Sequence, residues 1–207
     1  INLFTIKRSN SIKVKLTFAC SFLFTIVVIN VFNSRIGELP PLGKFFDPFH
    51  GYLALHKSDK LPDTDVLIND LHSDVDVVWD ERRIPHIYAQ NEHDLFFVQG
   101  YIHAFDRLWQ MEFQVMAAGG RLSEIIGEKA IPFDKFQRRI GMMRGAKNVV
   151  RDYQNNQTML SSLEAYRDGI NAYISKLESD LYPIEYKLLN YAPEPWTIRK
   201  CALLYMY

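Results

Sequence analysis

The chain has 207 residues, of which 48% are hydrophobic and 14% aromatic, so it can bury a core of domain size. Lysine plus arginine and aspartate plus glutamate number 24 each. The sequence shows no basic stripe interleaved with aromatic residues, and both features argue against nucleic-acid binding. The composition excludes a low-complexity chain and predicts one globular domain or a large piece of one.

The two ends of the sequence resemble cut ends. The chain begins at Ile1 rather than at methionine, and it stops at Tyr207 inside an apolar run without a glycine, proline or polar residue to end a helix. We therefore expect a fragment of a longer parent protein. Some of the functional residues of that parent are then expected outside this chain.

Only two cysteines occur, Cys20 and Cys201, and each lies within an apolar pattern. This number and placement predict neither a disulfide framework nor a thiolate metal site. Both side chains are expected to be small buried hydrophobic groups.

The N-terminus combines a basic segment, residues 1–15, with an apolar run over residues 16–32. A positive flank before an apolar run is typical of exported proteins, whose basic end stays in the cytoplasm. The run could be a cleaved signal peptide or an uncleaved membrane anchor of roughly bilayer length. Because no clear small-x-small cleavage site follows Phe32, the pattern favours the anchor. The sequence thus predicts a periplasmic or otherwise extracytoplasmic protein that contacts the membrane through residues 16–32.

Residues 33–73 are punctuated by proline and glycine and predict an irregular connector. Near its end, Val66–Leu71 is rich in β-branched and apolar residues and predicts a strand. Two further strands are expected at Val75–Trp79 and Ile84–Ala89. The polar residues 80–83 between them predict a turn, and residues 74–207 form the domain proper.

The rest of the chain predicts helices. Asn91, alone or with Glu92, is expected to cap a helix of about seven turns that ends at Gly119-Gly120. Its apolar residues nearly encircle the axis, which is typical of a core helix. Further helices are expected over Arg121–Ile126, Pro132–Ile140, Met143–Tyr153 and Thr158–Leu177, and one more after the Pro193–Trp196 corner with Thr197 as its cap.

Polar residues inside the long helix are the first candidates for chemistry. They are His103, Asp106, Arg107, Gln110 and Glu112, which fall within three turns of one another. They could form a buried acid-base or metal cluster. They could equally be buried charges that pair in a structural network. We favour the structural interpretation, because perturbed charges in packed helices are often only structural.

Histidines at positions 72, 86, 93 and 103 raise the question of a zinc site. No pair has HExxH or a similar ligand spacing, so zinc is not predicted. The chain also contains no GxGxxG, P-loop or GxSxG motif. The Gly119-Gly120 pair is expected to end a helix rather than to bind phosphate.

Six blocks occur in a specific order along the domain: DERRIPHIYA, DLFFVQGYIHAFDRLWQME, GRLSEIIGE, FDKFQRRIG, YRDGINAYI and YAPEPWT. In this order they resemble the penicillin acylase family, and the resemblance covers residues 74–207. Two positions depart from the pattern. Arg83 stands where many relatives have glycine, and Phe105 stands where they often have glutamine.

The resemblance implies an α+β fold, the four-layer αββα sandwich of N-terminal-nucleophile hydrolases. This piece would be mostly helical, with a short N-terminal strand pair. It also implies a precursor that cuts itself into two chains and exposes a serine at the start of the second. The α-amine of that serine titrates near neutrality and can act as the base.

The resemblance implies no catalytic, cofactor-binding or metal-binding residue within this chain. The sequence has no Gly-Ser, Gly-Cys or Gly-Thr junction at which the precursor could be cut. The family's acyl pocket and calcium site would follow beyond Tyr207, so a structural calcium ion is an expectation for the parent alone. Asp80, His86, Asp106 and Arg107 are then scaffold residues.

The expected function is hydrolysis of the linear amide bond of an acylated amine, such as a β-lactam, an acyl-homoserine lactone or an N-acyl amino acid. The partners implied are that small-molecule substrate and the second chain of the cleaved precursor. An alternative is a membrane-tethered binding or scaffold protein of the same architecture without turnover. A metal-dependent hydrolase is a third interpretation, which chelation would test. The sequence downstream of Tyr207 would separate the first two.

Overall fold

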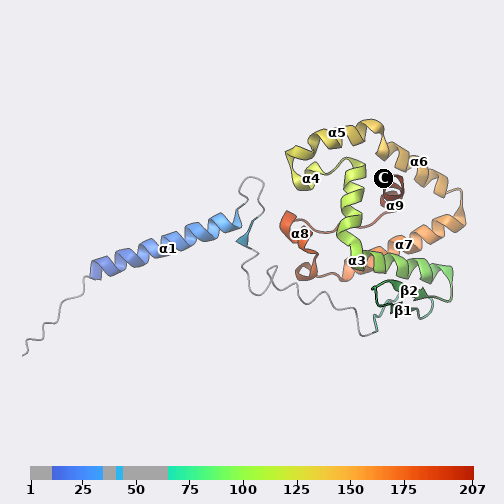
Figure 1. The fold of residues 1–207 in the computed structure, drawn as a ribbon, viewed down its shortest axis with the longest axis horizontal. Helices are drawn as coiled ribbons and strands as arrows, with labels where there is room; N and C mark the ends of the chain where they lie inside the picture. The colour runs from blue at the N-terminus through green and yellow to red at the C-terminus, as the bar shows by residue number, and fades with distance from the viewer. Residues whose placement is uncertain (1–10, 35–40, 44–64) are drawn as a thin grey trace, which may run out of the picture. The chain divides into compact units, whose positions relative to one another are not determined.

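The computed structural model describes residues 11–34, 41–43 and 65–207 (Figure 1). Contacts divide the chain into two units, Ile1–Ala54 and Leu55–Tyr207. Most of the predicted connector at residues 33–73 lies outside the described residues. Within the first unit, helix α1 (Ser11–Asn33) contains the whole predicted apolar run.

Helix α1 is long enough to cross a bilayer. Its 23 residues correspond to about 34 Å, against roughly 30 Å for a hydrocarbon core. The segment Lys13–Asn33 has a mean hydropathy of 2.0, and none of its most apolar stretch is buried. Polar side chains bond to the helix itself, since Thr25 Oγ1 donates to the Ser21 carbonyl at 2.9 Å and Asn30 Nδ2 to the Ile26 carbonyl at 2.8 Å. The prediction of a buried Cys20 was wrong, because this cysteine is exposed on α1.

The second unit begins with an antiparallel strand pair. Strands β1 (Asp76–Trp79) and β2 (Pro85–Tyr88) pair with Val77 opposite Ile87. This confirms two of the three predicted strands to within two residues. The prediction of a strand at Val66–Leu71 was wrong, because Asn69 and Asp70 form a turn there and such residues favour turns over a β-branched run.

The turn between β1 and β2 is held by one carboxylate. Asp80 Oδ1 accepts hydrogen bonds from the backbone N–H groups of Arg82 at 2.9 Å and Ile84 at 2.8 Å. Arg83 between them has φ of 61°, a left-handed conformation that favours glycine. A glycine at position 83 would adopt this backbone conformation with less strain than Arg83 does.

Helix α3 (Glu92–Gly119) has the predicted ends. The Asn91 side chain accepts from the Asp94 N–H, and Gly120 closes the helix with φ of 64°. The periodicity did not reveal that Arg107 has non-helical angles (φ −140°, ψ 17°), which divide α3 into two arms. Figure 1 shows this change of direction, which carries the second arm towards the helices that follow.

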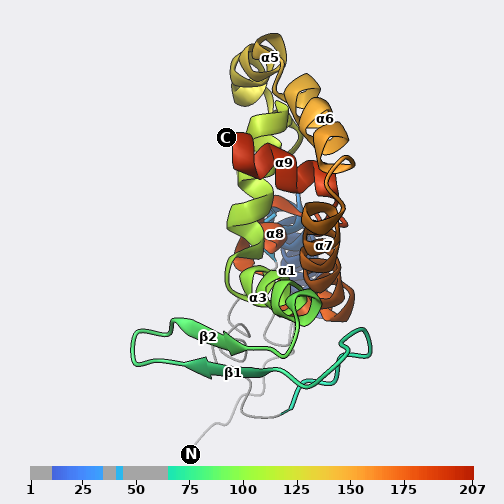
Figure 2. The same cartoon turned by 90° about the vertical axis from the view of Figure 1, so that its right-hand side faces the viewer.

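Helix α7 (Gln157–Lys176) packs on the first arm of α3 at unusually close range (Figure 2). A Cβ atom at Gly169 would overlap the Phe97 carbonyl oxygen, and one at Gly100 would overlap the Tyr166 carbonyl oxygen. The two glycines thus let the two backbones touch in a reciprocal pair of contacts.

Shorter elements complete the domain. They are α4 (Ser123–Ile126), η2 (Glu128–Ala130), α5 (Ile131–Ile140), α6 (Met142–Tyr153), η3 (Ser179–Leu181), α8 (Ile184–Leu189) and α9 (Ile198–Met206). The predicted helices match α4 to α7 and α9, whereas α8 was missed because six residues are too short for a periodic pattern.

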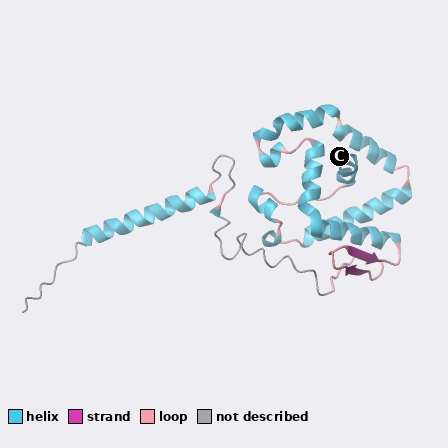
Figure 3. Cartoon of the chain, in the orientation of Figure 1, coloured by secondary structure: helices cyan, strands magenta, loops and turns pink. Residues whose placement is uncertain are grey.

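Helices dominate the described residues, with one strand pair at the start of the domain (Figure 3). This confirms the predicted mostly helical character with a short N-terminal strand pair. The four-layer sandwich remains a prediction for the parent. The main core brings α3, α6, α7, α8 and α9 around buried residues that include Leu108, Met111, Ile170, Trp196 and Leu203.

Candidate functional site

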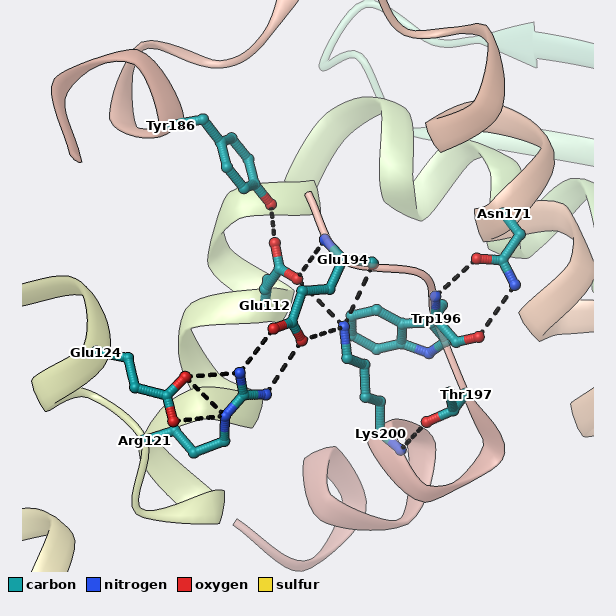
Figure 4. A network of polar contacts seen from close by, with 9 residues as sticks. All are labelled: Glu112, Arg121, Glu124, Asn171, Tyr186, Glu194, Trp196, Thr197 and Lys200. Atoms are coloured by element: carbon teal, nitrogen blue, oxygen red, sulfur yellow. Dashed lines mark hydrogen bonds and ion pairs between the residues drawn. The ribbon is translucent and has the colours of Figure 1, made fainter. Parts of the chain in front are cut away.

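A buried carboxylate in the second arm of α3 is the centre of the main polar network. Glu112 is 1% exposed. It accepts hydrogen bonds from the Tyr186 hydroxyl, from the Glu194 backbone N–H at 3.0 Å and from Lys200 Nζ at 3.2 Å (Figure 4). Burial and the neighbouring Glu112 charge raise the pKa of Tyr186, so its hydroxyl remains a proton donor.

A second carboxylate extends the network to the surface. Glu194 forms a bidentate pair with Arg121, at 2.6 and 3.1 Å, and also lies 3.3 Å from Lys200 Nζ. The same guanidinium binds Glu124, with the shortest contact at 2.7 Å. The hydrogen bonds to Glu194 and Glu124 raise the pKa of Arg121 further above its ordinary value.

The network fixes the corner at residues 193–196. Asn171 on α7 holds Trp196 from the other side, accepting from its backbone N–H at 2.7 Å and donating to its carbonyl at 3.0 Å. The indole of Trp196 is 2% exposed and donates to Cys201 Sγ at 3.3 Å. Thr197 then caps α9 as predicted, and Cys201 is buried as predicted.

A cavity of about 240 Å³ lies beside the network. Its lining comes from α3, α6, the corner and α9, and includes Val115, Arg121, Met143, Glu194, Arg199 and Lys200. Three donors, a tyrosine hydroxyl, a backbone N–H and a lysine ammonium group, contact the buried Glu112. A carboxylate held in this way is suited to fixing its neighbours rather than to exchanging protons with a substrate.

Acid should weaken this network. Hydrogen bonds from Arg121, opposed by partial burial, lower the pKa of Glu194 from 4.5 to about 2. A lowered folded-state pKa means that Glu194 stabilises the fold fully above pH 4.5, and that this contribution is lost as the pH falls towards 2. We expect Glu194→Gln to lower the urea midpoint of the full-length protein at neutral pH and the difference from wild type to shrink below pH 4.5. The exposed Glu128, changed to Gln, is the matched control, and a constant difference for Glu194→Gln across this range would contradict the expectation.

The polar cluster predicted in α3 does not form as a buried unit. His103, Asp106, Arg107 and Gln110 are exposed, and only Glu112 is buried. Both interpretations of the cluster assumed burial, and that assumption was wrong for four residues because they occupy the outer side of α3. His103 Nδ1 lies 2.9 Å from the Tyr166 hydroxyl, and Arg107 donates to Gln110 Oε1 at 3.2 Å. The structural interpretation holds for Glu112, whose partners come from positions 186, 194 and 200.

The histidines separate into distinct places. His86 Nε2 lies 3.8 Å from Asp80 Oδ2 beside the strand pair. His72 and His93 meet at the start of α3, with ring centroids 4.2 Å apart and with Asp94 beside them. The sequence spacing did not reveal this pair, because 21 positions separate His72 from His93. The path of the chain from the strand pair to α3 is what brings the two residues together.

Comparisons with known proteins identify relatives of the domain. The model of the penicillin amidase family matches residues 74–207. The penicillin G acylase of Escherichia coli is 31% identical over 137 residues, which are 65% of this chain and 16% of the relative. The penicillin acylase 2 proenzyme of a Pseudomonas species is 40% identical over 114 residues, 55% of this chain and 14% of the relative.

A relative with a different named substrate also matches. The acyl-homoserine lactone acylase QuiP of Pseudomonas aeruginosa is 32% identical over 151 residues, 72% of this chain and 17% of the relative. Among solved structures, a thermostable penicillin G acylase from Alcaligenes faecalis shares the fold, with a TM-score of 0.58 and 24% identity over 64% of this chain and 70% of that chain. The chain spans only 14% to 17% of the length of these three curated relatives.

Proposed function

Because the chain belongs to the penicillin amidase family, whose model matches residues 74–207, we propose that its parent protein is an amidohydrolase of the acylase type. The family match carries this proposal, and the names of the relatives support it. They include penicillin acylases and acyl-homoserine lactone acylases. The substrate is an acylated amine with a linear amide bond, and its acyl group binds in a pocket outside this chain.

The proposed reaction uses a serine outside this chain as nucleophile. Its hydroxyl oxygen attacks the amide carbonyl while its own α-amine takes the hydroxyl proton. The tetrahedral oxyanion is held by hydrogen-bond donors until the C–N bond breaks, and the α-amine passes the proton to the leaving amine. Water then attacks the acyl-enzyme ester and releases the carboxylic acid. The serine becomes N-terminal when the precursor is cut into two chains, as the name proenzyme of one relative suggests.

In this proposal residues 74–207 form the structural scaffold of the first chain of the cleaved precursor. The network around Glu112 and Glu194 ties the corner at 193–196 to α3, and Asn171 ties it to α7. Helix α9, which starts directly after the corner, is then held against the core in a defined direction. Residues after Tyr207 that line the acyl pocket would be positioned through it.

We also assign helix α1 the role of an uncleaved membrane anchor. Its apolar side chains point outwards all round, with Phe18 at 75% exposed and Phe24 at 69%. The polar side chains Thr17, Thr25 and Asn30 donate to carbonyl groups of the same helix, so a lipid environment would leave none of these three without a hydrogen bond. The enzyme would thus act outside the cytoplasm.

Intact-mass spectrometry and an activity panel test both parts of the proposal. The full-length protein, purified from the membrane fraction, should consist of two chains, the second starting with serine and the first retaining α1. It should hydrolyse chromogenic N-acyl amides or acyl-homoserine lactones. An uncut chain without turnover would favour the non-catalytic scaffold protein. A first chain that lacks residues 11–33 would contradict only the assignment of α1 as an uncleaved anchor.

Variants of the exposed α3 residues test whether this chain contributes acid-base chemistry to the proposed reaction. His103→Gln and Asp106→Asn should leave kcat/KM unchanged, because both residues are treated as scaffold. A large loss of kcat in either variant would place acid-base chemistry on this helix and contradict the proposed division of roles.

A further inference from the structure

Helix α5 exposes apolar side chains and buries polar ones, the reverse of an ordinary surface helix. Asp134 and Gln137 are buried. Phe136 and Ile140 face outward instead, with 58% and 54% of their side chains exposed. Because a surface helix usually buries its apolar side and exposes its charges, this arrangement indicates that an apolar partner covers the outer side of α5.

Hydrogen bonds fix the inward position of the polar side of α5. Asp134 Oδ1 accepts from the Leu122 N–H at 2.9 Å, and its Oδ2 accepts from the Ser123 N–H at 2.8 Å. These bonds tie the first turn of α5 to the start of α4. With this side of α5 held against the domain, Phe136 and Ile140, one turn apart, stay on the outside.

Two basic side chains border the exposed apolar pair. Lys135 and Arg139 are exposed, and each precedes one of the apolar residues by a single position. Residues four apart lie on the same side of a helix, so Lys135 and Arg139 form one row and Phe136 and Ile140 form the adjacent row. A cationic row beside an apolar row is the pattern of helices that lie at a membrane surface.

The positive charge continues onto α6. Residues 129–151 contain seven lysine and arginine residues and one acidic residue, the buried Asp134, so the balanced charge of the whole chain conceals a local excess. Helices α5 and α6 follow one another along the outer edge of the domain (Figure 1). Three basic residues of α6 are exposed on one side of that helix: Arg144, Lys147 and Arg151.

These cations are available to a partner. Among the residues that the structure describes, no ion pair neutralises Lys135, Arg139 or the three basic side chains of α6. Five cations beside an apolar row fit a partner that is both anionic and apolar. A bilayer with anionic headgroups has both properties.

We propose that the exposed side of α5 and α6 docks onto an anionic membrane surface. Phe136 and Ile140 enter the boundary between headgroups and acyl chains, and the five basic side chains lie among the lipid phosphates. The inference rests on the proposed membrane anchor α1, which keeps the domain beside a bilayer. Docking then gives the domain a fixed orientation on that bilayer.

The second chain of the cleaved precursor is the competing occupant of this surface. A contact between protein chains would have to remove water from five cations, and the centres of such interfaces are depleted of charged residues. A bilayer surface accepts both kinds of side chain, because lysine and arginine reach the phosphates while the apolar row enters the lipid. The charge pattern therefore favours lipid.

Amide hydrogen exchange of the full-length protein in lipid nanodiscs tests the proposal. Discs of phosphatidylcholine alone are compared with discs that contain about one third phosphatidylglycerol. In the anionic discs, peptides that cover residues 131–153 should exchange slower by about threefold or more. A salt concentration of about 0.5 M should abolish this difference, since salt screens the attraction between phosphates and basic side chains.

Variants separate this surface from the net charge of the protein. Lys135→Gln combined with Arg139→Gln should remove most of the protection in anionic discs, and Phe136→Ser alone should do the same. Arg82→Gln combined with Lys176→Gln is the matched control, because it removes two exposed positive charges from other parts of the domain. In this control the protection of residues 131–153 should equal that of wild type.

Two results would overturn the docking proposal. One is equal exchange of residues 131–153 in both kinds of disc. The other is faster exchange of the second chain when Lys135→Gln and Arg139→Gln are combined, which would assign the surface to that chain. Protein that enters neither kind of disc contradicts the anchor on which the proposal rests, whereas protein that enters without protection contradicts the docking alone. Neither readout depends on amidase activity.

Discussion

Gly169→Ala is expected to lower the stability of the domain by about 3 kcal/mol or more, the upper end of the range for overpacking. The added methyl group would overlap the Phe97 carbonyl oxygen and lie 3.0 Å from the Tyr101 backbone nitrogen. Both atoms belong to the backbone of α3, so no side-chain rotation can relieve the overlap. The two helices would have to move apart along their shared face.

Gly119→Ala is the matched control for this variant. Gly119 also lies in a helix, but its added Cβ would find its nearest neighbour, Met143 Sδ, at 3.6 Å, an ordinary contact. This change should be neutral or stabilising by up to about 1 kcal/mol, since alanine favours a helix more than glycine does.

Urea denaturation and soluble yield of the full-length protein would measure both variants. Gly100→Ala should behave like Gly169→Ala, because its Cβ would overlap the Tyr166 carbonyl oxygen. The double variant should lose less than the sum of the single losses, since helices already separated by one methyl group accommodate the second more easily. Equal stability of Gly169→Ala and Gly119→Ala would contradict the close approach of α3 and α7.

Glu112→Ala is expected to lower stability by about 3–5 kcal/mol, the range found when one partner of a buried ion pair is removed. Lys200 is 7% exposed and loses one of its two carboxylate partners in this variant. The Tyr186 hydroxyl and the Glu194 backbone N–H lose their acceptor at the same time. A buried donor without an acceptor carries its own desolvation penalty.

A double variant separates the ion pair from simple loss of volume. Glu112→Leu combined with Lys200→Met removes both charges and should recover part of the stability lost in Glu112→Ala, since apolar replacement of a whole buried pair is often neutral or favourable. Glu128→Gln on the surface should stay within about 0.5 kcal/mol of wild type. Thermal unfolding of the four proteins measures these differences. A near-neutral Glu112→Ala would show that the network does not hold the corner.

Local signals predicted most of the secondary structure. The ends of α3 follow from Asn91 and Gly120, which satisfy helix ends through a side-chain acceptor and a left-handed backbone. The strand pair follows from two β-branched runs around a polar turn. Where the local signal misled, at Val66–Leu71, turn residues inside the run decided the conformation.

The candidate site was predictable only in part. The sequence picked out Glu112 among five polar residues of one helix, and it could not show that four of them are exposed. Burial depends on which side of the helix a neighbour covers, and the kink at Arg107 changes that side midway along α3. The partners of Glu112 lie 74 to 88 positions away, beyond the reach of any local pattern.

The sequence by itself determined the family, through six ordered blocks, and the positions of the main helices, through periodicity and capping residues. The blocks are patterns of residues that are close in sequence, and helix formation depends on interactions between such residues. Both can therefore be read along the chain. Only the tertiary structure decided that Gly100 meets Tyr166, that Glu112 meets Lys200 and that His72 stacks on His93. Each of these contacts joins distant segments, and its existence depends on how the helices pack in three dimensions.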